Sequence, residues 1–195
     1  MRSKKQQIQY HLDSGQISHL EFNEIKAILR ASDEIIATGG RSMLAKILKG
    51  SKDKKLLEHK LDLCPVYGYY KSITLTEISH RIDFVIEKGY LDIQYSYRLP
   101  VIVYTEKGWE IERETYAKEL YQKLEELLKE NDFSYVAELK DRNRGMILLL
   151  IEKITKSGNP DFIPLLRTWQ EIEYKKVRTA LQKAINGLSN QRDSL

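Results

Sequence analysis

The residues whose types and spacing could do chemistry are the cations of residues 41–60. This stretch holds seven Lys and Arg residues against two acidic ones, whereas residues 61–140 hold ten cations against fifteen anions. A glycine–serine turn flanked by lysines suits a phosphate group, because helix-start amides and ammonium groups both attract it. The candidate binding residues are Arg41, Ser42, Lys46, Lys49, Gly50, Ser51, Lys52, Lys54 and Lys55. A merely solvated lysine-rich turn is the alternative that the charge run leaves open.

Other kinds of active site find little support in the sequence. Cys64 is the single cysteine, so the chain has no internal disulfide and no multi-cysteine zinc site. The four histidines (His11, His19, His59 and His80) lack the spacing of metal ligands. No GxxxxGK[ST] nucleotide loop and no GxSxG nucleophile motif occurs. We therefore expect no catalytic residue, no metal and no cofactor.

The element that must position the cations is a compact unit in residues 74–109. Ile78, Ile82 and Val85 recur at helical spacing after the start signal Thr76, and Gly89 stands where a helix C-cap belongs. This pattern predicts an amphipathic helix of about three turns.

Two short runs rich in aromatic and β-branched residues, 90–97 and 101–104, follow this helix and are typical of strands. Arg98, Leu99 and Pro100 between them are too few for anything but a hairpin tip. A helix followed by a two-stranded ribbon indicates the second half of a winged helix-turn-helix.

The flanking segments read as helices and turns. Residues 19–38 predict a helix interrupted near Ser32 and Asp33, residues 41–48 a short helix, and Ser51 with Asp53 the start of another whose first amides face solvent. The tyrosine-rich loop 65–72 is expected to pack beneath the wing, and residues 1–18 to form a frayed polar arm.

Beyond the wing, residues 106–130 predict a long helix, and we place a domain boundary after Asn131. Residues 132–188 predict three or four helices, with residues 189–195 as a tail. Within them, residues 158–185 resemble a HEAT-type helical repeat. One such repeat cannot bury its own face, so it should cap the preceding helices or dock on a protein partner.

The expected fold class is therefore mainly α with a small β-hairpin wing: a winged helix, a long helix and a small HEAT-like bundle. No apolar run approaches the roughly 20 residues of a membrane span, and no apolar signal region follows the basic start. These features favour a cytoplasmic protein without membrane contact, with association with the nucleoid as an option.

A family resemblance rests on three segments within residues 24–120: EIKAILRASDEIIATGGRSMLAKILKGSKDKKL, YGYYKSITLTEISHRIDFVIEKGYLDI and YTEKGWEI. They resemble the RQC domain, the winged helix that follows the helicase core in RecQ-family DNA helicases. The ILKGSKDKKL turn, with the helix, wing and TEKG order behind it, is the specific part. Without a helicase core or zinc cysteines, the chain is similar to the small free-standing bacterial proteins grouped as RQC-minor.

The resemblance implies a binding mode. In that family the domain holds duplex DNA where it meets single strands, the turn binds phosphates, the wing is a wedge at the duplex end, and the usual base-reading helix lies away from the groove. Carried over, Lys49, Gly50, Ser51 and Lys55 fall in the phosphate turn, and Tyr97, Arg98 and Leu99 at the wedge. The best-known members carry an aromatic at the tip, whereas Arg98 aligns there in this chain.

The leading hypothesis is thus a non-enzymatic protein that binds duplex or branched DNA through residues 41–55, with the wing at an end, fork or junction. A protein-interaction adaptor, with the winged helix as a platform and the HEAT-like end as the docking surface, is the alternative from another class. An RNA or ribosome-associated binder shares the basic surface.

Overall fold

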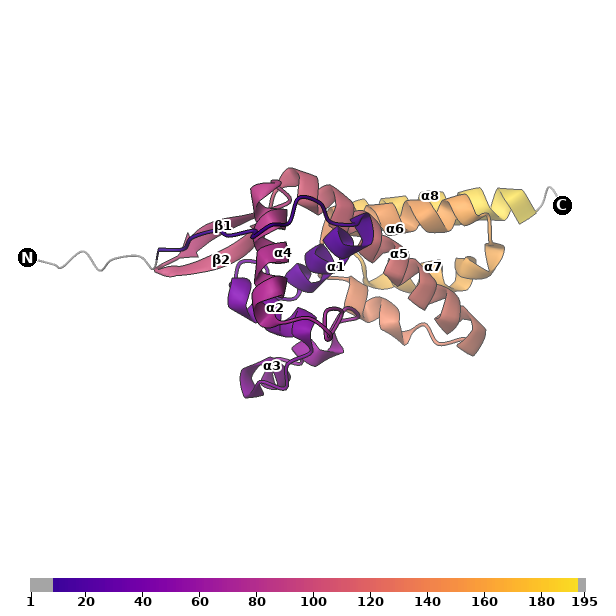
Figure 1. Cartoon of the computed structure of the whole chain (residues 1–195). Coiled ribbons are helices and arrows are strands. Elements are labelled where there is room, and N and C mark those ends of the chain that lie inside the picture. Colours follow the sequence, from indigo (N-terminus) through magenta and orange to yellow (C-terminus); the bar gives the residue numbers. More distant parts are fainter. Residues whose placement is uncertain (1–8, 193–195) are drawn as a thin grey trace, which may run out of the picture. The chain divides into compact units, whose positions relative to one another are not determined.

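The computed structural model describes residues 9–192, which form helices joined by one antiparallel hairpin (Figure 1). Contacts between Cα atoms divide the chain into two units, Met1–Glu112 and Arg113–Leu195. The division falls inside the long helix α5 (Glu106–Glu130), whereas the boundary expected from the sequence follows that helix.

The first unit has the element order of a winged helix. Its elements are α1 (Phe22–Asp33), α2 (Arg41–Lys49), α3 (Lys54–Glu58), a 3-10 turn (Leu61–Leu63), α4 (Leu75–Glu87), β1 (Leu91–Ser96), β2 (Leu99–Tyr104) and the start of α5. The expected class, mainly α with a hairpin wing and further helices, is confirmed.

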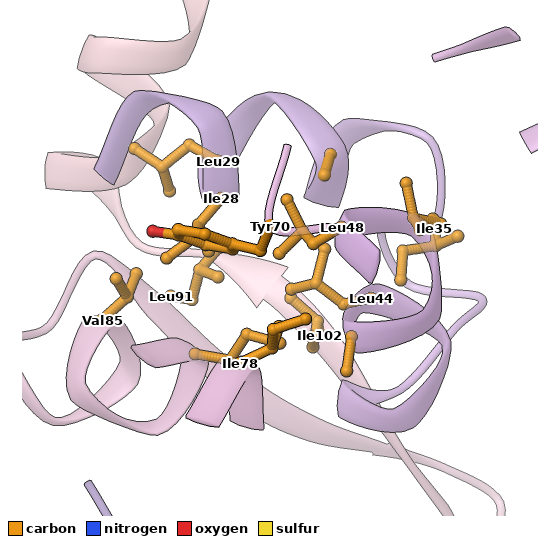
Figure 2. Close-up of a cluster of buried hydrophobic side chains, with 14 of the residues drawn as sticks. Ile28, Leu29, Ile35, Leu44, Leu48, Tyr70, Ile78, Val85, Leu91 and Ile102 are labelled. Carbon is orange, nitrogen blue, oxygen red and sulfur yellow. The ribbon is translucent and has the colours of Figure 1, made fainter. Parts of the chain in front are cut away.

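The core of this unit gathers side chains from each of its larger elements. Figure 2 shows Ile28 of α1, Leu44 of α2, Ile78 of α4, Leu91 of β1 and Ile102 of β2 converging on one another, and all five are buried. Burying such a side chain is worth about 1.5–3 kcal/mol. The apolar faces of these helices, which the sequence spacing predicted, therefore pack together with the buried face of the wing.

Helix α4 is held at both ends by local signals. At its start the Thr74 side chain accepts from the Glu77 N–H while the Glu77 carboxylate accepts from the Thr74 N–H, so the helix begins one residue before the expected Thr76. These bonds lower the pKa of Glu77. Gly89, expected as the cap, follows the helix end with a left-handed φ of 69°.

The hairpin is tighter than expected. Ser96 pairs with Leu99 and Tyr95 with Pro100, so Tyr97 and Arg98 alone form the turn. The expectation that Leu99 and Pro100 belong to the tip is wrong, because both lie in β2. Tyr97 has a φ of 56°, which is costly for a residue other than glycine.

The described part of the N-terminal arm is not frayed. Leu12 and Ile17 pack against the core of the first unit, and the Asp13 N–H donates to the Asp83 carboxylate of α4 at 2.8 Å. The expectation of a frayed arm is therefore wrong for residues 9–18. Leu12 and Ile17 are spaced too irregularly to predict a helix, but both side chains still reach the core. Residues 1–8 of the expected arm, and 193–195 of the expected tail, lie outside the described residues.

The tyrosine-rich loop also lies elsewhere than expected. Its backbone bonds the C-terminal end of α2, with the Gly68 N–H donating to the Ile47 carbonyl at 2.9 Å and the Tyr70 N–H to the Leu48 carbonyl at 2.8 Å. Tyr70 is buried in the core (Figure 2). The loop thus supports α2 rather than packing beneath the wing.

The second unit is helical. It comprises the rest of α5, a 3-10 segment (Ser134–Leu139), α6 (Arg144–Ser157), a 3-10 turn (Pro160–Phe162), α7 (Ile163–Ile172) and α8 (Lys175–Arg192). Helices α6 and α7 each pack on α8 around buried Leu150, Leu166, Trp169 and Leu181. Helix α8 ends at Arg192 and so continues into the expected tail of residues 189–195. Within residues 9–192, no helix is long and apolar enough to cross a membrane.

Candidate nucleic-acid interface

The turn between α2 and α3, residues 49–55 (hereafter the basic turn), is fixed by a close approach of two backbones. Gly50 ends α2 with a φ of 74°, and a Cβ at this position would lie 3.1 Å from the Cα of Gly68. A side chain there would therefore meet both strain and backbone contact. The Tyr67 hydroxyl donates to the Ser51 carbonyl at 3.0 Å, which fixes the next residue of the turn.

The carboxylate of Asp53 caps the start of α3. The Asp53 side chain accepts from the Lys55 N–H at 3.0 Å and lies 2.7 Å from the Lys46 ammonium. The bond from Lys46 holds the pKa of Asp53 below its usual value. Of the helix-start amides expected to face solvent, the Lys55 N–H is thus already bonded to Asp53 at the surface.

Besides Lys46, two of the predicted binding cations are engaged inside the protein. Lys49 donates to the backbone carbonyls of Lys71 and Ile73 at 2.8 and 2.6 Å. Arg41 pairs with Asp83 of α4, whose two carboxylate oxygens lie 2.5 and 2.6 Å from one guanidinium nitrogen, and Asp83 is 4% exposed. Lys49 therefore ties the loop before α4 to α2, and Arg41 ties α4 itself to α2.

Four other predicted residues are exposed: Ser42 at the start of α2, and Lys52, Lys54 and Lys55 in and after the turn. Lys54 lies 3.7 Å from the Glu58 carboxylate, an exposed pair that costs little to break. The lysines available to a ligand are therefore these three, with Lys46 half-buried beside Asp53.

An open cleft of about 580 Å³ links α2 to the base of the wing. It brings together Arg41, Ser42, Lys46 and Lys55 with Pro100 of β2. The wing is held there by the backbone, since the N–H of Ala37 donates to the carbonyl of Ile102 at 2.8 Å and the N–H of Ile102 to the carbonyl of Gly39 at 2.9 Å. The same cleft is also lined by Gln9, Tyr10 and His11, which sequence reasoning missed; an aromatic inside an otherwise polar arm was the available signal.

The wing tip is open to solvent. Tyr97 is 96% exposed and Leu99 60%, and Arg98 is exposed as well. The exposed ring of Tyr97 on the strained turn and the exposed side chain of Leu99 at the start of β2 form an apolar edge. The three predicted wedge residues therefore lie together, although Leu99 belongs to the strand.

Helix α4, which in many winged helices reads base edges, is crossed by the N-terminal segment (Figure 1). The Asp13 amide bonds Asp83, its carboxylate lies 3.5 Å from His80, and a Cβ on Gly15 would meet the His80 ring at 2.8 Å. The segment therefore covers the middle of this helix, whereas Leu75, Thr76 and Glu77 of its first turn are exposed. Among residues 9–192, no three side chains of the metal-ligating types are grouped so as to hold an ion.

The fold and this surface define a winged-helix domain with a basic turn beside the wing. Residues 22–128 match the family model of the RQC domain, and the chain belongs to this family. It is also 30% identical over 124 residues to an ATP-dependent DNA helicase RecQ of Bacillus subtilis (strain 168), an alignment that covers 64% of this chain and 20% of the helicase. No solved structure matches it. The RQC domains of RecQ helicases are non-catalytic DNA-binding domains.

Proposed function

We propose that this protein binds duplex DNA without catalysing a reaction, and that it does so at ends, forks or junctions. The observation that carries the proposal is the cleft in which Lys55 of the basic turn, Lys46 and Ser42 share one surface with the base of the wing. The RQC family membership supports DNA as the ligand.

The residues of this surface would have different roles in DNA binding. Lys52, Lys54 and Lys55 would contact the phosphates, and Ser42 would add a hydroxyl at the start of α2. Lys49 and Arg41 would act indirectly, since their charged groups already bind protein atoms. Gly50 and Ser51 would set the path of the turn.

The wing would meet the place where the strands part. A tyrosine ring can stack on an exposed base for about 1–3 kcal/mol. Tyr97 presents such a ring and Arg98 a guanidinium that can bind a phosphate or stack. Because the N-terminal segment covers the middle of α4, binding should depend on the DNA structure more than on base sequence.

The test is a salt titration with forked, blunt and single-stranded oligonucleotides. The variant Lys52→Glu, Lys54→Glu, Lys55→Glu should lose three phosphate contacts, which lowers the salt slope by about 2.7 and the affinity by roughly 10²–10³-fold at about 0.1 M salt. The matched control, Lys88→Glu, Lys107→Glu, Lys118→Glu, changes the net charge equally at exposed lysines elsewhere. Equal loss in both variants would refute the placement of the site.

The wing is tested separately. Tyr97→Gly relieves the left-handed backbone and should leave the fold intact while lowering fork affinity and sparing long blunt duplex. An equal loss of affinity for the fork and for the blunt duplex would show that the wing does not recognise the strand junction. Competition with matched RNA and DNA hairpins distinguishes the RNA-binding hypothesis.

The adaptor hypothesis requires an apolar patch at the tyrosine loop or at Trp169. Trp169 is fully buried and Tyr70 is 7% exposed, while Tyr69 is 44% exposed. The burial of Trp169 and Tyr70 favours the DNA hypothesis. An adaptor becomes the better interpretation if none of the oligonucleotides binds.

We further propose that residues 132–188 form a HEAT-like helical domain and that residues 19–131 act as the DNA-binding domain. The sequence pattern of residues 158–185 supports the first statement, and the match of residues 22–128 the second. Limited proteolysis tests the boundary, because cleavage should begin after α5, near Asn131, and not within it.

A further inference from the structure

A second basic cleft, of about 460 Å³, lies wholly within the second unit, at the starts of α6 and α8. Its lining includes five cations: Lys140, Arg142, Arg144, Lys175 and Lys176. Two acidic residues also line it, Asp141 and Glu173. Glu173 is 2% exposed and accepts from the Trp169 indole N–H at 2.9 Å and the Tyr174 N–H at 3.1 Å, so its charge is used inside the protein.

The positions of three of these cations oppose the stability of their helices. Arg144 is the first residue of α6, and Lys175 and Lys176 are the first two of α8. The first turns of both helices lack acidic residues. Cations at the positive end of a helix dipole are unfavourable, and a bound anion would relieve that repulsion. All three are exposed, and none forms an ion pair within the described part of the chain.

The cleft also holds a flat aromatic surface. Tyr174, between α7 and α8, is 62% exposed, with the Lys140 ammonium 5.3 Å from its ring centre. Cations interleaved with an exposed aromatic ring are the combination that holds single-stranded nucleic acid, the cations along the backbone and the ring against a base. An acidic peptide would use the cations but not the ring.

We propose that this cleft is a second nucleic-acid site, which binds the phosphates of a single strand through Arg144, Lys175 and Lys176 while Tyr174 stacks on a base. The site shares no residue with the basic turn or the wing. It therefore goes beyond the proposed duplex site and can fail or succeed independently of it.

The experiment uses the full chain carrying Lys52→Glu, Lys54→Glu, Lys55→Glu, so that the basic turn does not obscure the cleft. The probe is a labelled oligothymidylate of about 15 nucleotides, followed by fluorescence anisotropy over about 50–300 mM salt. Adding Arg144→Gln, Lys175→Gln, Lys176→Gln removes the cleft cations. The control adds Lys118→Gln, Lys123→Gln, Lys183→Gln, which are exposed in the same unit but do not line the cleft.

The basic-turn variant should still bind the single strand. The cleft substitutions should lower its salt slope by about 2 and its affinity about 100-fold at 0.1 M salt, and the control should not. Tyr174→Ala should lower the affinity about 5- to 150-fold with the slope unchanged, because stacking involves no counterion release. Circular dichroism of each variant establishes that its helices remain.

Three results would overturn the proposal: no single-strand binding by the basic-turn variant, equal loss in the cleft and control variants, or displacement of the oligonucleotide by an equally charged poly-glutamate peptide at the same concentration. The last would assign the cleft to an acidic protein. Full fork binding by the basic-turn variant would instead refute the proposed function. The cleft proposal would then still be decided by comparing the cleft variant with its lysine control.

Discussion

The basic turn and the C-terminal cleft are similar in charge but differ in what their cations contact. At the basic turn Lys46 pairs with Asp53 and Lys49 with two carbonyls, and nearby Arg41 pairs with a buried aspartate. In the cleft, Arg144 and Lys176 form no ion pair within residues 9–192. A count of cations along a sequence therefore does not measure the charge that a ligand can reach.

The largest expected effect concerns Arg41. Arg41→Ala leaves the Asp83 carboxylate buried without its cation, and should lower the free energy of unfolding by about 2–4 kcal/mol, less than a fully buried pair because Arg41 is partly exposed. Urea denaturation measures it. The exposed Lys52→Ala should change stability by no more than about 0.5 kcal/mol. Similar losses of unfolding free energy in the two variants would show that engaged and available cations do not differ in their contribution to stability.

Lys49 provides the next test. Lys49→Met removes two charged hydrogen bonds to backbone carbonyls, and should cost about 1–3 kcal/mol of stability. Its DNA salt slope should stay unchanged, whereas Lys55→Met should lower the slope by about 0.9 with little change in stability. If Lys49→Met instead lowered the slope and kept the stability, Lys49 would be a phosphate ligand, as the family resemblance implies.

In the C-terminal cleft the expected sign is reversed. Arg144→Glu places an anion at the positive end of α6 and should raise the free energy of unfolding by about 0.3–1 kcal/mol. Thermal unfolding followed by circular dichroism measures the gain. Lys183→Glu, in the middle of α8, should give no such gain. A destabilised Arg144→Glu variant would mean that this cation supports the fold.

The smallest effect concerns pH. Because Lys46 lowers the pKa of Asp53, the carboxylate stabilises the folded basic turn at pH values above the unfolded pKa near 3.8, and this contribution is lost as the pH falls through the lower folded value. Carboxyl NMR should find Asp53 titrating below 3.8, and Lys46→Met should move the value upward. An unchanged titration would show that the Lys46 contact does not persist in solution.

The sequence predicted the elements of the first unit because their signals are local. The spacing of Ile78, Ile82 and Val85 and the cap at Gly89 specify a helix without reference to distant residues. The wing followed from strand-forming runs on either side of a short break. The tip was expected at residues 98–100 but lies at Tyr97 and Arg98, because the turn needs a left-handed residue and Tyr97 carries no sign of one.

The contacts of the site could not be predicted in the same way. Arg41 and Asp83 are 42 residues apart, and the carbonyls that bind Lys49 belong to residues more than 20 positions away. Only the fold brings such groups together. The C-terminal cleft was missed for the same reason, since Arg144 and Lys175 lie on different helices and only the fold places them at one cleft.

The strap formed by residues 13–15 over His80 and Asp83 has a consequence for where such a protein would act. With the middle of α4 covered, the proposed DNA binding would show little preference for base sequence. Its occupancy would instead rise and fall with the number of open ends and branches present at any moment, so that replication or damage, rather than an operator, would decide when it is bound.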